Sequence, residues 1–270
     1  MITVVKASGE KEPFSEEKVR ASIRRAAVAK ELQEQVVEHV KSKLYENIKT
    51  SEIYRHIIEF LATSKTPFTR SKYSLKQAIM DLGPTGYPFE DFVAEILKAM
   101  GWVTTVRTIL QGKCVTHEID ITAIKNSEKA VIEVKFHNLP GTKTGIHEAL
   151  YTKARFNDVV EKNDFNQVWL VTNTKISLDA ITYGVCMGMK VISWNYPEDG
   201  SLRDLIEQVR LHPITALTAL SQSQKQKLLE NHVVRCLDIC QNPTVLDQLE
   251  INDEQKKAVL SEAQFVCNRV

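Results

Sequence analysis

The 270-residue sequence predicts a multidomain α/β protein, and three observations support this fold class. A short alternating run, TVVK, opens the chain ahead of helical patterns. Apolar, strand-like runs then alternate with helical patterns between residues 86 and 196, and the C-terminal part is helical alone. The Gly- and Pro-rich stretch DLGPTGYP (81–88) marks the clearest boundary. We therefore expect three regions, at residues 1–82, 83–211 and 212–270.

The first region has the pattern of a β-hairpin followed by a helical bundle. The run TVVK leads into a Gly-containing turn, ASGEKEP, and the segment SEEKVRASIRRAAVAKEL then has helical periodicity. The segment TSEIYRHIIEFLATS carries an apolar stripe at Ile53, Ile57, Ile58 and Leu61. Both helical segments begin with hydroxyl and acidic side chains, which favour a helix start.

The second region predicts an α/β core with a mixed sheet. FEDFVAEILKAMGW has helical spacing, and Gly101 is expected to end that helix. Three strand-like runs follow it, WVTTVRTIL, THEIDITAI and KAVIEVKF. Two helical patterns, HEALYTKARFNDVVEK and ISLDAITYGVCMG, then alternate with the strands QVWLVT and KVISWN. The third region contains three helical segments, TALTALSQSQKQKLLE, HVVRCLDICQN and NDEQKKAVLSEAQFV, without recognisable chemistry.

Composition excludes several classes of protein. The chain is 43% hydrophobic and 26% charged with a net charge of +1, so any contact with nucleic acid must come from a local patch. The five cysteines are scattered and odd in number, which argues against a disulfide framework and for a reducing compartment. The N-terminus lacks a charged-then-apolar leader, and no apolar run approaches the roughly 20 residues that span a bilayer. We expect a cytoplasmic protein without membrane contact.

The stretch VIEVKF places two opposite charges on one face of a predicted strand. Glu133 and Lys135 are two residues apart, so their side chains project together, while Ile132, Val134 and Phe136 occupy the other face. The preceding run, EIDITAI, alternates as well, with Asp120 on its polar face. The turn KNSEK between the runs is short, so a hairpin brings Asp120 beside Glu133 and Lys135.

Two neighbouring carboxylates resist ionising together unless a cation lies between them. Mg²⁺ or Mn²⁺, which prefer hard oxygen ligands, would remove this conflict at Asp120 and Glu133. Lys135 would then support a water molecule that attacks a phosphodiester. The alternative is a hairpin with one hydrated face, on which Asp120 and Lys135 form an ordinary cross-strand ion pair.

The order of elements around this Asp-x12-Glu-x-Lys pattern resembles the PD-(D/E)xK nuclease superfamily, in its Mrr-like restriction endonuclease branch. The resemblance covers roughly residues 86 to 196, and VWLVTN and VISWNYP match later strands of such proteins. It implies that Asp120 and Glu133 are metal ligands, that Lys135 is the catalytic lysine, and that Glu90 completes the metal shell through its side chain or a water. The proline of the pattern is absent, because Ile119 precedes Asp120.

Side chains near this pattern are secondary candidates for holding a phosphate backbone. His137 and Asn138 follow Lys135 directly. His147, Tyr151 and Arg155 recur at four-residue steps and so share one helical face. The alternative, which we favour, is an ordinary solvated helix face.

The N-terminal segment VVKASGEKEPFSEEKVRASIRRA, with the later IKTSEI, resembles the ATP-cone, a nucleotide-binding regulatory domain. The match covers most of residues 2 to 80. It implies that Lys6, Lys18 and Thr50 contact the nucleotide and that Val4, Val5 and Glu12 shape its base and ribose end. Lysines can neutralise a triphosphate, and a helix start attracts anions. The family usually reads Lys-Arg-Asp-Gly where this chain reads Lys-Ala-Ser-Gly (6–9), so a bidentate phosphate donor is missing and binding can be weaker, altered or lost.

Other patterns in the sequence are weaker indications of function. His232, Cys236 and Cys240 recur every four residues, as ligands on one helical face would, but no second pair at ligand spacing lies nearby, and buried cysteines are the preferred interpretation. No Walker-type loop occurs, which excludes a motor ATPase of that kind. The C-terminal helices fit oligomerisation, sheet cover or DNA binding equally.

These patterns predict a metal-dependent DNA endonuclease, with ATP or dATP as an effector of the N-terminal domain. Double-stranded DNA is the expected partner and a homo-oligomer the expected assembly. The alternative is a nucleotide-sensing protein that binds nucleic acid or another partner without cutting. RNA or branched DNA would suit the same three side chains, because the phosphodiester chemistry is shared.

Overall fold

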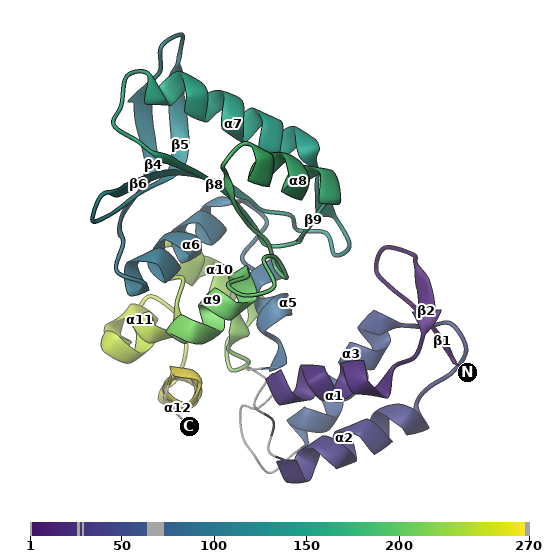
Figure 1. Cartoon of the computed structure of the whole chain (residues 1–270). Coiled ribbons are helices and arrows are strands. Elements are labelled where there is room, and N and C mark those ends of the chain that lie inside the picture. The colour runs from purple at the N-terminus through teal and green to yellow at the C-terminus, as the bar shows by residue number, and fades with distance from the viewer. Residues whose placement is uncertain (1, 26–27, 29, 64–72, 268–270) are drawn as a thin grey trace. The chain divides into compact units, whose positions relative to one another are not determined.

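The computed structural model describes residues 2–25, 28, 30–63 and 73–267 (Figure 1). They form two compact units, one of residues 1–78, 212–227 and 236–270 and the other of residues 79–211 and 228–235. Among the described residues, no helix is long and apolar enough to cross a membrane. The multidomain α/β class, with N-terminal strands and helices, a central mixed sheet and C-terminal helices, is confirmed.

The described residues of the N-terminal part form a small sheet and the helices that pack on it. Its elements are β1 (Thr3–Val5), β2 (Lys11–Pro13), α1 (Glu16–Arg25), α2 (Lys30–Ser42), β3 (Ile48–Lys49) and α3 (Thr50–Ala62). The strand order is β2-β1-β3, with β1 antiparallel to β2 and parallel to β3. The apolar stripes of these elements meet in one core, which includes Val4, Ile23, Val36, Ile48 and Ile57. The predicted hairpin and bundle therefore share a single hydrophobic cluster.

The helical pattern predicted from Ser15 onward forms two helices, α1 and α2. Ser15 precedes α1, and its Oγ accepts a hydrogen bond from the backbone N–H of Lys18 at 3.3 Å, as an N-terminal cap does. Residues 26, 27 and 29, between the two helices, lie outside the described residues.

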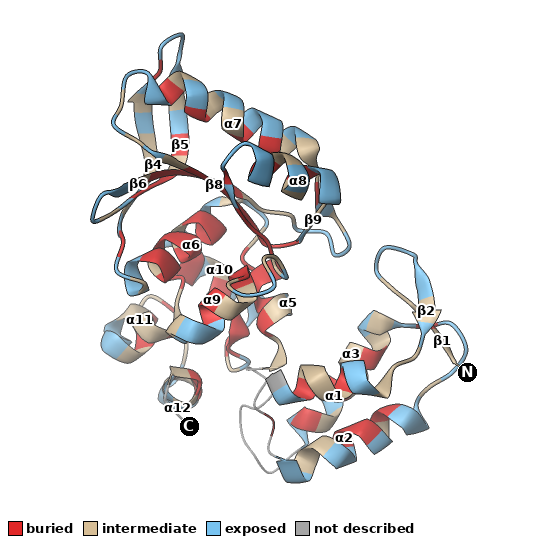
Figure 2. Ribbon diagram, in the orientation of Figure 1, coloured by how far each residue is buried: buried red, intermediate tan, exposed pale blue. Residues whose placement is uncertain are grey.

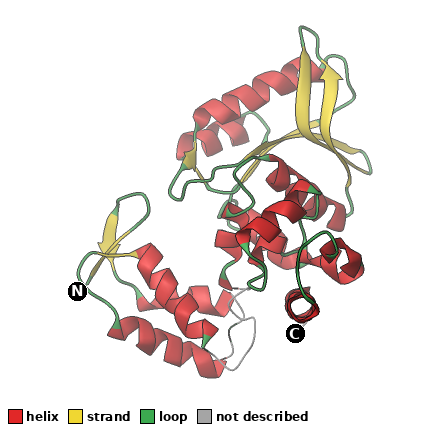
Figure 3. Cartoon of the chain, turned by 180° about the vertical axis from the view of Figure 1, so that it is seen from behind, coloured by secondary structure: helices red, strands yellow, loops and turns green. Residues whose placement is uncertain are grey.

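The central part is a five-stranded mixed sheet with helices on both faces (Figure 3). Its elements are α6 (Tyr87–Ala99), β4 (Val103–Gln111), β5 (Thr116–Lys125), β6 (Glu128–Lys135), α7 (Ile146–Val160), β8 (Gln167–Thr172), α8 (Leu178–Cys186) and β10 (Lys190–Ile192). The strand order is β10-β8-β6-β5-β4. β4, β5 and β6 are antiparallel, whereas β8 is parallel to β6 and β10 is parallel to β8.

Alternate residues of the strands pack into two separate hydrophobic cores, one on each face of the sheet. On one face, Val131, Val168 and Leu170 pack with Phe156 and Val159 of α7, in a cluster that α8 completes. On the other face, α6 presents an almost fully buried apolar side, visible as red ribbon in Figure 2. Because β6 is buried on both faces, Ile132 and Val134 are covered as completely as Val131.

Asp158, near the C-terminal end of α7, fastens that helix to the β4–β5 hairpin. Its carboxylate accepts hydrogen bonds from the backbone N–H groups of Cys114 (2.8 Å) and Val115 (3.3 Å). Nε2 of His117 lies 2.8 Å from Oδ2 of Asp158, and these bonds lower the pKa of the Asp158 carboxyl. The contacts fix the position of α7 along the sheet and so determine which α7 side chains reach β6.

The remaining elements are short except for α12. They are α5 (Leu75–Met80), β7 (Lys143–Thr144), β9 (Lys175–Ile176), α9 (Leu202–Val209), η1 (Ile214–Ala216), α10 (Gln222–Glu230), α11 (Cys236–Gln241), η2 (Pro243–Leu246) and α12 (Asp253–Cys267). The parallel strands β7 and β9 form a two-stranded ribbon.

The first C-terminal helix is shorter than its sequence pattern predicted. TALTALSQSQKQKLLE becomes α-helical only at Gln222, after the short 3-10 helix η1, because the backbone between them is bound elsewhere. The buried carboxylate of Glu262 on α12 accepts hydrogen bonds from the N–H groups of Thr218 (2.8 Å) and Ala219 (2.9 Å) and from the Thr218 hydroxyl (2.8 Å). These N–H groups therefore bind a side chain that is distant in sequence, and not the carbonyl oxygens of a helical turn.

We predict that Glu262→Gln lowers the free energy of unfolding by about 3 kcal/mol, because an amide offers one acceptor oxygen and turns N–H groups toward buried donors. Urea unfolding measures this loss. Glu254→Gln is the matched control, since Glu254 is exposed on the same helix. Equal effects of the two substitutions would contradict the assigned role of Glu262.

Candidate active site

Asp120 and Glu133 come together at the point where the pairing of β5 with β6 stops. The ladder between these strands ends at Ile121 opposite Ile132, and Asp120 and Glu133 are the next residues on each strand. One step beyond, Oδ2 of Asp120 accepts a hydrogen bond of 2.7 Å from the backbone N–H of Val134. The side chain thus takes the place of a backbone carbonyl, which fixes the Asp120 carboxylate beside Glu133.

Glu90, from the first turn of α6, joins this pair from the other face of the sheet. Its residue is 8% exposed, and its Oε2 accepts a hydrogen bond of 3.1 Å from Nη1 of Arg107 on β4. Nη2 of Arg107 donates to Oδ1 of Asp91 at 2.6 Å. Arg107 has a left-handed backbone with φ of 51°, and it interrupts the β4–β5 ladder between Val106 and Thr108.

The enclosed carboxyls resist ionisation. Burial, and then the negative charge of Asp120, raise the pKa of Glu90 to about 7 and the pKa of Glu133 to about 7. Burial also raises the pKa of Asp120, although the Val134 N–H acts in the opposite direction. Such mutually raised pKa values in a polar cluster are typical of functional sites, because structure alone rarely requires neighbouring buried carboxyls.

Arg155 on α7 is the ion-pair partner of Glu133. Its Nη1 donates to Oε2 of Glu133, and its Cζ lies 5.1 Å from the centre of the Tyr151 ring. The interpretation of a solvated face is therefore wrong for Arg155, because Glu133 shares the sheet face of Val131, which α7 covers. His147 and Tyr151, from the same predicted set, are exposed.

Lys135 stands at the end of β6, and its ammonium has no hydrogen bond or ion pair with any described residue. The chain after it is held firmly, since Asn173 forms two hydrogen bonds with the backbone of His137. The His137 N–H donates to Oδ1 of Asn173 at 2.9 Å, and Nδ2 of Asn173 donates to the His137 carbonyl at 2.8 Å. His137 itself lies 3.0 Å from the Thr144 hydroxyl, and Asn138 is exposed. The cross-strand ion pair of Asp120 with Lys135 is not formed.

The donor set suits a hard divalent cation. Within the described parts of the chain, no three His, Cys, Asp or Glu side chains converge as a complete metal cage. Mg²⁺ does not need one, because it usually keeps several waters and uses one or two carboxylates together with phosphate oxygens. Asp120 and Glu133 provide that pair. Burial is the main cause of their raised pKa values, and a bound cation would favour their ionised forms.

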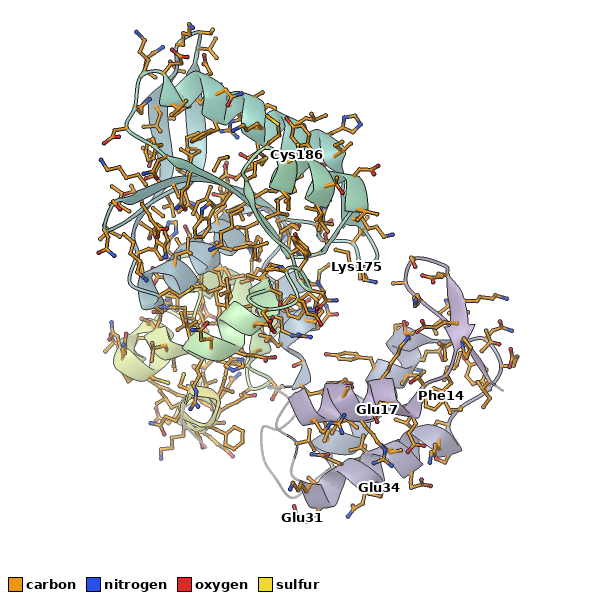
Figure 4. All side chains as sticks on the ribbon, viewed as in Figure 1. Phe14, Glu17, Glu31, Glu34, Lys175 and Cys186 are labelled. Atoms are coloured by element: carbon orange, nitrogen blue, oxygen red, sulfur yellow. The ribbon has the colours of Figure 1, made fainter. Side chains whose placement is uncertain are left out.

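The N-terminal part contains a cavity of about 250 Å³ between its hairpin and its helices. Four of the six residues predicted to bind a nucleotide line it, namely Val4, Glu12, Lys18 and Thr50. Phe14, labelled in Figure 4, lies in the same wall. Val5 and Lys6 are not among the lining residues.

Lys6 nevertheless contacts the cavity wall through Glu12. Nζ of Lys6 and Nζ of Lys18 both lie 2.8 Å from Oε2 of Glu12, so one carboxylate joins two cations that are twelve residues apart. The hydrogen bond from Lys18, followed by that from Lys6, lowers the pKa of the Glu12 carboxyl. Thr50 is the first residue of α3, whose cap position is Lys49. The lysines and the helix start thus lie on one small domain.

Several residues of these sites were missed in the sequence. Arg107 belongs to no sequence motif, because only the pairing of β4 with β5 places it beside Glu90. Tyr54 and Tyr73 line the N-terminal cavity with ring centres 5.4 Å apart, and their separation by 19 positions in the sequence hides this stacking. The aromatic enrichment around residues 54 and 73 was the sequence feature that could have drawn attention to them.

The predicted helical spacing of His232, Cys236 and Cys240 is wrong for His232. α11 begins at Cys236, and His232 has a left-handed backbone with φ of 58°. Its Nδ1 lies 2.9 Å from Oδ2 of Asp91. Cys236 is fully buried, as the preferred interpretation expected.

Comparison with known families agrees with this division of the chain. Residues 2–79 match the family described as ATP cone domain, and residues 84–196 match the family described as Restriction endonuclease. Residues 212–267 match the family described as AF1548-like, C-terminal. Both resemblances found in the sequence are therefore confirmed.

Individual proteins are also similar to long parts of this chain. An uncharacterized protein of Archaeoglobus fulgidus is 38% identical over 175 residues, which are 64% of this chain and 99% of that protein. The crystal structure of AF1548, a protein of unknown function, is 36% identical with a TM-score of 0.59, over 67% of this chain and 98% of its own. Protein VC1899 from Vibrio cholerae is a much weaker match, with 15% identity and a TM-score of 0.32 over 73% of this chain and 57% of its own. The chain therefore belongs to the AF1548-like family, and it combines an ATP cone domain with a restriction endonuclease domain.

Proposed function

We propose that this protein is a Mg²⁺- or Mn²⁺-dependent endonuclease that hydrolyses phosphodiester bonds of double-stranded DNA. The observation that carries the proposal is the meeting of Asp120, Glu133 and Glu90 beside Lys135, whose ammonium forms no ion pair with a described residue, inside the restriction endonuclease match. We further propose a homo-oligomer with regions at 1–82, 83–211 and 212–270.

Each side chain has a distinct part in this mechanism. Asp120 and Glu133 would hold the cation, with Glu90 completing its shell directly or through water. When bound, the cation would stabilise the charge that develops on the phosphate and make a nucleophilic water available at neutral pH. The hydrogen bond from the Val134 N–H keeps the Asp120 carboxylate oriented. The Lys135 ammonium, which no described residue engages, would orient the attacking water and favour the negatively charged transition state.

The N-terminal domain would bind ATP or dATP as an effector. Lys18, Thr50, Glu12 and Val4 around one cavity support this assignment, with Lys6 within reach of the same carboxylate. The nucleotide would act by binding one conformational or oligomeric state more tightly than another, and not as a source of energy.

Plasmid cleavage with Mn²⁺ or Mg²⁺, with and without ATP and dATP, tests the proposal. We predict that Asp120→Asn lowers the cleavage rate roughly a hundredfold or more, because it removes a carboxylate from the proposed metal site. Lys135→Met should lose cleavage as well but should keep Mn²⁺ binding, since Lys135 is not a ligand. Glu128→Gln, at an exposed position where β6 begins, is the control and should cleave normally.

Cleavage by Asp120→Asn at the wild-type rate would overturn the mechanism. Absence of cleavage together with absence of Mn²⁺ binding would favour the non-cleaving, nucleotide-sensing alternative. Cleavage of RNA or of branched DNA in place of plasmid would keep the site and correct the substrate.

The raised pKa values of Glu90 and Glu133 predict a pH dependence with a definite sign. Both carboxyls hold protons up to about pH 7, so Mn²⁺ affinity should rise between about pH 6 and pH 8 as they ionise. Without metal, the folded state binds these protons more tightly than the unfolded chain does. The free energy of unfolding should therefore fall as the pH rises from about 4.5 through about 7. Denaturant titrations with chelator follow this loss, and Glu133→Gln should flatten it. A stability that increased over this window would contradict the assignment.

Lys18→Ala should weaken ATP binding about tenfold, because it removes a charge-assisted hydrogen bond to phosphate. A fluorescent ATP analogue or calorimetry measures the dissociation constant. Lys43→Ala removes an exposed lysine outside the cavity lining and is the charge-matched control. If both variants bound ATP as the wild type does, the cavity would not be the nucleotide site.

A further inference from the structure

Arg155 contacts the carboxylate that the proposed function assigns to a metal ion. Its Nη1 pairs with Oε2 of Glu133, and its side chain is 10% exposed. The guanidinium also lies against the ring of Tyr151, which is itself 58% exposed. The guanidinium of Arg155, on α7, therefore already places a positive charge beside Glu133 of β6.

This guanidinium is not fully satisfied where it lies. Nε of Arg155 is buried and has no hydrogen-bond partner among the described residues. A buried donor without a partner is unfavourable, and guanidinium groups normally bind carboxylates through two parallel bonds. The position of Arg155 thus depends on the pairing of Nη1 with Glu133, which is a full ion pair above the raised pKa of Glu133, about 7.

The ion pair and a bound cation compete for the same group. The bond from Arg155 occupies one acceptor site of Oε2 of Glu133, and two positive charges at this distance repel each other in a partly buried site, so a cation at Glu133 weakens the ion pair. Lys135 is not the counter-ion of Glu133 in this structure, since it forms no ion pair with any described residue.

We propose that Arg155 is the resident counter-ion of Glu133 in the metal-free protein, and that a divalent cation displaces it. The inference rests on the proposed function, because Glu133 is a metal ligand only there. Arg155 acts through Glu133 and is a positioning residue: it keeps the carboxylate in place without metal and sets the cation concentration at which the site fills.

Mn²⁺ binding, measured by electron paramagnetic resonance of free Mn²⁺, tests this exchange without any cleavage assay. Arg155→Gln should bind Mn²⁺ more tightly, on the order of tenfold, because the competing charge is gone. Arg155→Lys keeps the charge and should bind close to the wild-type affinity. Lys153→Gln removes a charge from the same helix without touching Glu133, so it controls for the general field.

Thermal unfolding separates this role from a merely structural one. In chelator, Arg155→Gln should melt below the wild type, because Glu133 has lost its counter-ion. Saturating Mn²⁺ should raise the melting temperature of Arg155→Gln by more than it raises that of the wild type, since tighter binding stabilises more. In the wild-type protein, the Nε–H resonance of Arg155, assigned by its absence from Arg155→Lys, should shift when Mg²⁺ is added. This readout does not depend on whether the Gln variant folds.

The outcomes distinguish this inference from the proposed function. Unchanged or weaker Mn²⁺ binding by Arg155→Gln would overturn the exchange, while binding that depends on Asp120 and Glu133 would leave the nuclease proposal intact. Binding by Arg155→Gln alone would support the exchange and show that Arg155 blocks the wild-type site. No binding by either protein, with an Arg155 resonance unmoved by Mg²⁺, would overturn both.

Discussion

The enclosure of like charges within a sheet is the constraint on which the central part of this protein depends. Asp120 and Glu133 lie where two strands separate, and Glu90 approaches from a helix. A fold stable without ligand must neutralise such a cluster, and Arg107 and Arg155 provide the positive charge from β4 and α7. Helix placement therefore matters to charge balance as much as to packing, which is why Asp158 fastens α7 to the hairpin.

The sequence predicted most of the fold because its strong periodicities are local. Alternation in EIDITAI and VIEVKF, separated by a short polar turn, was sufficient to predict the hairpin of β5 and β6. The C-terminal helix start was mispredicted for the opposite reason. Glu262 lies more than 40 residues from Thr218 in sequence, so the interaction that keeps this segment from being helical leaves no local pattern.

The candidate site could likewise be predicted where its residues are close in sequence, and not where distant segments meet. Asp120, Glu133 and Lys135 follow from the spacing of one hairpin, and Glu90 followed only from family resemblance. The arginines could not be assigned, because a charged residue on a helix or strand is usually solvated and only tertiary pairing distinguishes Arg155 from its neighbour His147. In the N-terminal domain, Glu12 gave no indication that it would hold two lysines at once.

The left-handed backbone of Arg107 has a consequence away from the site. β4 is one of the two edge strands of the five-stranded sheet, and it exposes Val103 and Ile109. An uninterrupted apolar edge of this length would invite strands of other chains to add to it and aggregate. The kink at Arg107 divides β4 into Val103–Val106 and Thr108–Gln111, neither longer than four residues. The residue that neutralises Glu90 thus also leaves the sheet with an edge too irregular to template a neighbour.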